Sequence, residues 1–139
     1  GRYYQALMER IEATIGEARE YERLSDSADR LEKAAGAMAG ATEAINAVKA
    51  SGDKEKALAN ATLYLDAFGQ VVVGWLWLRQ GLKAVAGLER SDGQDDAFYE
   101  GKLKACEYFA RYELPGVVSV AELLKAVDET ALSMADAAF

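Results

Sequence analysis

The spacing of apolar residues is the strongest constraint on the fold, because they recur every three or four positions along most of the 139-residue chain. This spacing places apolar side chains on one side of an α-helix. The single proline, Pro115, leaves long stretches in which helices can continue. Alanine, leucine, glutamate and lysine favour helices, and 51% of the residues are hydrophobic, which is enough for a core. The sequence therefore predicts an all-α protein.

The pattern divides into five predicted helices separated by residues that cap or end helices. The predicted helices span residues 2–21, 28–50, 54–86, 95–114 and 119–138. The predicted breaks are residues 25–27 (Ser-Asp-Ser), 51–53 (Ser-Gly-Asp, with Asp53 as an N-cap), 87–94, and Pro115 with Gly116. These lengths predict an antiparallel four-helix bundle with a short extra C-terminal helix, forming a single domain over residues 1–139.

Two of the predicted helices have unusual surfaces. Most side chains of residues 34–41 (AAGAMAGA) are small. The two glycines, Gly36 and Gly40, are unfavourable inside a helix, so we predict that another helix packs closely there. The helix over residues 54–86 is apolar on nearly all sides, so it is either central or docked on another domain. Its most apolar run, residues 67–78, is shorter than the ~20 residues needed to cross a bilayer. We therefore expect a buried helix.

Composition excludes several classes of function. A net charge of −7 argues against binding to nucleic acid or to an anionic membrane surface. The one cysteine, Cys106, precludes an internal disulfide and fits a reducing compartment, so a cytoplasmic location is expected; Cys106 itself is predicted to be an inert core residue. Histidine, the commonest general base and metal ligand, is absent. Glycine-rich phosphate loops and metal-binding motifs are also missing. We predict no catalytic, cofactor-binding or metal-binding residue in this chain.

Asp66 and Gln70 are the first two of four candidate interface or packing residues, all within the apolar third helix. A buried carboxylate is costly unless it is paired. Asp66 is therefore interpreted as pairing with Lys102 or Arg111 of a neighbouring helix. The alternative is a catalytic base or a ligand contact.

Trp77 and Arg79 are the other two candidates. Trp75 and Trp77 point about 200° apart on a helix, so they cannot line one pocket wall. Trp75 is predicted to fill the core and Trp77 to meet another surface, the alternative being stacking on a flavin or adenine ring. Arg79, Lys83 and Arg90 form a mild basic patch near the end of the third predicted helix. Positive charges there interact favourably with the C-terminal end of the helix dipole. The alternative is contact with a pyrophosphate or a CoA.

Three segments, residues 60–80 (NATLYLDAFGQVVVGWLWLRQ), 95–115 (DDAFYEGKLKACEYFARYELP) and 123–139 (LLKAVDETALSMADAAF), resemble the C-terminal extension of acyl-CoA dehydrogenases. The similarity is to the subgroup of 3-methylmercaptopropionyl-CoA dehydrogenase-like enzymes, and it covers residues 7–139 without a single diagnostic motif. It implies that the chain is the C-terminal fragment of a larger enzyme. That enzyme would bind FAD and remove hydrogens from the α and β carbons of an acyl-CoA thioester.

The resemblance also implies what this fragment contacts. The catalytic glutamate and most flavin contacts would lie upstream, so no cofactor is expected in this fragment. The expected partners are the upstream dehydrogenase domains of the same chain and a second subunit of a homo-oligomer, with no nucleic acid and no membrane. One competing hypothesis is a stand-alone helical-bundle interaction module. Another is a small-ligand binder that uses the space between the helices.

Overall fold

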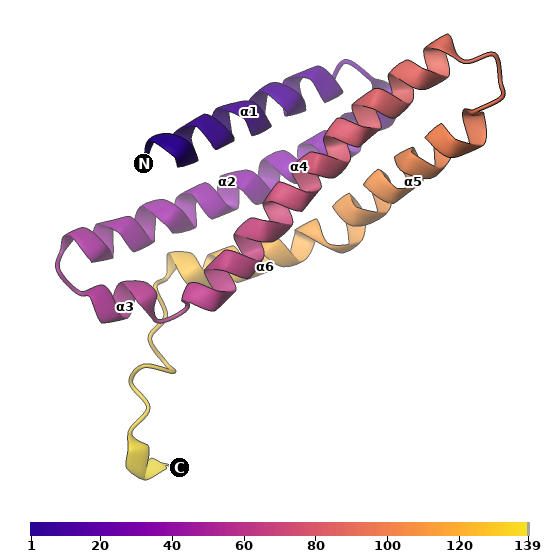
Figure 1. The fold of residues 1–139 in the computed structure, drawn as a ribbon. Coiled ribbons are helices and arrows are strands. Elements are labelled where there is room, and N and C mark those ends of the chain that lie inside the picture. The colour runs from indigo at the N-terminus through magenta and orange to yellow at the C-terminus, as the bar shows by residue number, and fades with distance from the viewer. Residues whose placement is uncertain (139) are drawn as a thin grey trace.

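The computed structural model describes residues 1–138, and all regular secondary structure within this range is helical, which confirms the predicted all-α class. The elements are α1 (Arg2–Ala18), α2 (Glu22–Ala50), α3 (Lys54–Leu58), α4 (Ala61–Arg90), α5 (Asp96–Tyr112), α6 (Leu114–Lys125) and the 3-10 helix η1 (Asp136–Ala138). Figure 1 shows the long helices running lengthwise beside one another, with α3 at one end and the chain after α6 leading away.

The two longest helices, α2 and α4, organise the packing. α2 contacts α1, α3, α4, α5 and α6, and α4 contacts α1, α2, α5 and α6. α6 continues nearly in line with α5, so these two helices together cover one side of the α2–α4 pair (Figure 1). Every long helix can thereby bury one apolar face against its neighbours.

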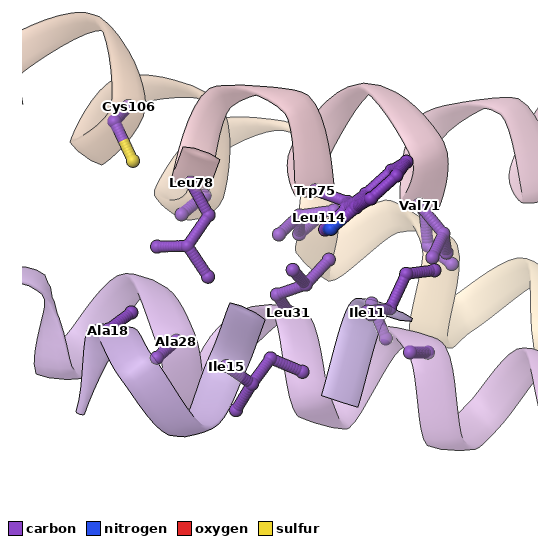
Figure 2. Packing of buried hydrophobic residues seen from close by; sticks show 14 of the residues in the cluster. Ile11, Ile15, Ala18, Ala28, Leu31, Val71, Trp75, Leu78, Cys106 and Leu114 are labelled. Carbon is purple, nitrogen blue, oxygen red and sulfur yellow. The ribbon is translucent and has the colours of Figure 1, made fainter. Parts of the chain in front are cut away.

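The core lies between α1, α2 and α4 and is closed by α5 and α6. Figure 2 shows side chains from these helices converging. The largest fully buried side chains are Ile11, Leu24, Leu31, Met38, Val71, Leu78, Leu103, Leu114 and Leu124. Trp75 is only 7% exposed, and its indole Nε1 donates a hydrogen bond to Thr14 Oγ1 at 2.9 Å. The prediction that Trp75 fills the core is confirmed.

Close helix approach depends on glycines of α4 and not on those of α2. A Cβ on Gly81 would lie 2.8 Å from Leu24 Cδ2, and a Cβ on Gly87 would lie 2.4 Å from Tyr99 Cζ. A Cβ on Gly36 would meet nothing within 4 Å, and one on Gly40 would only touch the Lys125 side chain at 3.9 Å. The predicted role of Gly36 and Gly40 was therefore wrong.

The first predicted break was also misplaced. Residues 25–27 lie inside α2, and the chain turns earlier, at Tyr21, whose backbone is extended with φ −112° and ψ 120°. Inside the helix, Asp26 accepts hydrogen bonds from Arg30 at 3.0 Å and Arg111 at 3.3 Å. Ser27 is buried, with 3% exposure. The segment continues as helix because the side of α2 that carries Leu24, Ser27 and Ala28 is buried.

The predicted helix over residues 54–86 is two helices, because the chain turns at residues 59–60 between α3 and α4. α4 then continues four residues further than predicted, to Arg90. Asp53 caps α3, accepting a hydrogen bond from Lys56 N at 3.0 Å, which confirms its predicted role as an N-cap.

The last long helix, α6, begins and ends earlier than the helix predicted over residues 119–138. Pro115 lies in the first turn of α6, where its missing N–H has no partner to lose, so a new helix begins at Leu114 directly after α5. The predicted helix over residues 119–138 ends at Lys125. Val127 follows with φ 51°, and Met134, expected on the apolar side of the predicted helix, is 48% exposed. Phe139, quoted in the resemblance, lies outside the described residues.

Candidate functional site

α4 carries an apolar stripe that no other part of residues 1–138 covers. Leu65, Val73 and Leu76 are 69%, 41% and 42% exposed. At about 100° per residue, they lie within about 80° of one another around the helix. Val71 and Leu78 point to the opposite side and are buried in the core. α4 therefore buries one apolar face and presents a second one to solvent, as docking surfaces do.

The structure brings three of the four predicted candidates to one edge of this stripe. Asp66, Gln70 and Trp77 lie about 100–140° from Leu65 around the helix, beside Val73. Gln70 and Trp77 are half-buried and Asp66 is exposed. The indole of Trp77 therefore has one side on the protein and one side free for a partner.

The predicted pairing of Asp66 was wrong. Within residues 1–138, Asp66 forms no ion pair with Lys102 or Arg111. Arg111 pairs with Asp26 at 3.3 Å, and Lys102 Nζ lies 5.9 Å from the Trp77 ring centroid. Asp66 lies on the solvent side of α4, so its charge needs no partner from the protein.

Arg79 lies at the other edge of the stripe and packs on the core tryptophan. Its guanidinium carbon is 5.1 Å from the Trp75 ring centroid, and that of Arg10 is 5.4 Å away. Such cation–π contacts stabilise by about 0.5–1 kcal/mol at exposed sites. Arg79 is too far from the end of α4 to act on the helix dipole, whose effect is confined to the last turn. Arg90 occupies that turn.

Cys106 is buried in α5, as predicted, with 2% exposure. Burial raises the pKa of its thiol to about 11. A hydrogen bond with Ser27 opposes this shift, and the Glu107 carboxylate adds to it. The thiol therefore stays protonated and unreactive near neutral pH.

Ion pairs between distant segments hold the outer surfaces together, and sequence periodicity gave no signal for them. Arg19 pairs with Asp29 at 2.9 Å and Glu32 at 2.7 Å, which links the end of α1 to α2. The hydrogen bond that Arg19 donates to Glu32 lowers the pKa of that carboxyl group. In the part of the chain that the structure describes, no cluster of three acidic, histidine or cysteine side chains could hold a metal ion.

α4 is also long and apolar enough to cross a membrane on length and composition alone, a test that core helices of soluble proteins pass as well. Its contacts with α1, α2, α5 and α6 are those of the central helix of the fold.

A family model described as "Acetyl-CoA dehydrogenase C-terminal like" matches residues 7–135. The chain belongs to this family. It is 35% identical over 77 residues to the broad-specificity linear acyl-CoA dehydrogenase FadE5 of Mycobacterium tuberculosis, covering 55% of this chain. It is 33% identical over 90 residues to the butyryl-CoA dehydrogenase of Syntrophomonas wolfei, covering 63% of this chain. These matches span 13% and 15% of the length of the two relatives. The predicted relation to the C-terminal part of acyl-CoA dehydrogenases is confirmed.

Proposed function

We propose that this chain is the C-terminal domain of an FAD-dependent acyl-CoA dehydrogenase of the 3-methylmercaptopropionyl-CoA dehydrogenase-like subgroup. The parent enzyme carries out α,β-dehydrogenation of an acyl-CoA thioester, with FAD and the catalytic residues in its other domains. The family match and the names of the two relatives support the relation to acyl-CoA dehydrogenases, and the resemblance of the three segments supports the subgroup. The proposal includes a cytoplasmic location and the architecture of an antiparallel four-helix bundle with a short extra helix.

Within that enzyme, the domain is non-catalytic and docks through α4 on the dehydrogenase core or on a second subunit of a homo-oligomer. The exposed stripe of Leu65, Val73 and Leu76 is the observation that carries this role. Burying apolar surface contributes about 25 cal/mol per Å² removed from water. Asp66 and Arg79 at the edges of the stripe would form the polar rim that surrounds the apolar centre of an interface.

Two leucines of α4 offer a matched test in the longer dehydrogenase chain that contains this domain. Leu76 is 42% exposed on the stripe, and Leu63 is 41% exposed about 140° away around the helix. Leu76→Lys places a charge in the interface and should lower the thermal stability of the enzyme and speed proteolytic release of the domain. Leu63→Lys should change neither property.

The isolated 139-residue chain serves as the control, because both leucines are already exposed in it. Its circular dichroism and unfolding midpoint should be the same for the two variants. Equal behaviour of L76K and L63K in the longer enzyme would remove the α4 stripe as the docking surface. A flavin absorption band in the isolated chain would contradict placing FAD in the other domains.

A further inference from the structure

A small pocket lies at the end of the molecule where α2, α3, the start of α4 and the end of α6 meet. Its volume is about 190 Å³. The apolar part of its lining consists of Ile45, Ala57, Leu58, Ala61, Leu124 and Val127. An apolar cavity of about 150 Å³ is large enough to bind benzene, so this larger pocket has room for an alkyl chain of medium length.

The two hydroxyl groups in the lining have no proton left to give to a ligand. Thr42 Oγ1 lies 2.8 Å from the carbonyl oxygen of Met38 and 2.8 Å from the Tyr64 hydroxyl. A hydroxyl carries one proton. Thr42 donates its proton to Met38, so Tyr64 donates its own to Thr42. The lining therefore offers no hydroxyl donor to an anion, and its apolar side chains suit an alkyl group.

The charged part of the lining is entirely positive. Lys49 and Lys56 line the pocket and no carboxylate does, although the chain has a net charge of −7. Among the side chains that the structure describes, neither lysine has an ion-pair partner. The nearby Asp53 is engaged as the cap of α3. An anionic group at this pocket would gain two cations that the protein does not use elsewhere.

We propose that this pocket binds a small amphipathic anion, namely a medium-chain carboxylate. Its alkyl chain lies against Ile45 and Leu124, and its carboxylate stays beside Lys49 and Lys56. The site is separate from the α4 stripe and does not depend on docking to a dehydrogenase core.

Nuclear magnetic resonance titration of the 139-residue chain with octanoate tests the site. Amide shifts should concentrate at Thr42, Ala57 and Leu124. The double substitution Lys49→Gln with Lys56→Gln should weaken octanoate binding about tenfold, because it removes two charges from the carboxylate. Lys54→Gln is the matched control, since Lys54 belongs to the same short helix and does not line the pocket. It should leave the affinity unchanged.

Further probes separate the contribution of the ligand's alkyl chain from that of its carboxylate charge. Octanol should bind more weakly than octanoate and should not respond to the lysine substitutions, and inorganic phosphate should not bind. Ala61→Phe fills the pocket and should abolish binding of octanoate; if this variant does not fold, the lysine pair and its control decide.

Four binding results would overturn the proposal. They are octanoate shifts spread over the surface, equal effects of the lysine pair and K54Q, equally tight binding of octanol, and undiminished binding to a folded A61F. Nuclear Overhauser contacts from Leu132 or Met134 to Leu124 without ligand would also overturn it, because the chain's own tail would then be the occupant.

Discussion

At the scale of single residues, stability depends on how much room each position of α4 has. Gly81 faces Leu24, which is completely buried and cannot move without displacing its neighbours. Gly69, on the same helix, has nothing within 4 Å of the place where a Cβ would be. The same substitution at these two glycines therefore separates packing from helix propensity.

Gly81→Val should be less stable than Gly69→Val by about 2–3 kcal/mol, since overpacking a core costs about 1–3 kcal/mol and this collision is close. Urea unfolding followed by circular dichroism measures the difference. If the two variants have the same midpoint, α2 and α4 do not approach as closely at Gly81 as the structure indicates.

The buried thiol of Cys106 predicts a loss of stability in alkaline solution. Its pKa is raised by burial to about 11 in the folded chain, against 9.0 in the unfolded chain. The unfolded chain therefore loses this proton first as the pH rises. The stabilisation is complete below pH 9 and is lost progressively as the pH rises through 11, by about 3 kcal/mol in total.

Cys106→Ala removes the titrating group, so the difference between the wild type and this variant isolates its effect from tyrosines and lysines. The free energy of unfolding of the wild type should fall more steeply between pH 9 and pH 11 than that of the variant. Parallel curves would exclude the thiol as the cause.

At the scale of helices, periodicity predicted where the apolar faces run, and the predicted break at residues 51–53 is where α2 ends and α3 begins, but several other helix ends were misplaced. Residues 25–27 have the side chains of a cap, yet Asp26 pairs with Arg111, a residue 85 positions away that no local pattern can indicate. Pro115 was expected to end a helix and instead lies in the first turn of one. The positions of helix ends depend on tertiary contacts, and a local sequence pattern does not contain them.

The end of α6 provides a test at this scale. Val127 has φ 51°, a left-handed conformation that costs a β-branched residue energy and that glycine adopts freely. Ala126, one position earlier, has φ −70°. Val127→Gly should therefore be more stable than Ala126→Gly by about 1 kcal/mol. Thermal unfolding compares them, and the opposite order would show that Val127 does not hold this conformation.

At the scale of the whole molecule, the sequence predicted the helical class and the relation to acyl-CoA dehydrogenases better than it predicted surfaces. Asp66, Gln70, Trp77 and Arg79 were selected for their unusual place in an apolar helix. They lie at the edges of the exposed stripe. Asp66 lies there as an exposed charge and not as the buried, paired carboxylate that was expected. The pocket was not predicted, because its lining combines α2, α3, α4 and α6, and only the folded chain brings these segments together.

Both tryptophans of the chain belong to α4. The indole of Trp75 is enclosed beside Thr14, whereas that of Trp77 is half-open at the edge of the stripe. Intrinsic fluorescence therefore reports on one helix from two sides. Denaturation should shift the emission of Trp75 to longer wavelength, while an acrylamide quencher should reach Trp77 first and lose that access when a partner covers α4. A Trp77→Phe variant would leave a signal from the interior alone.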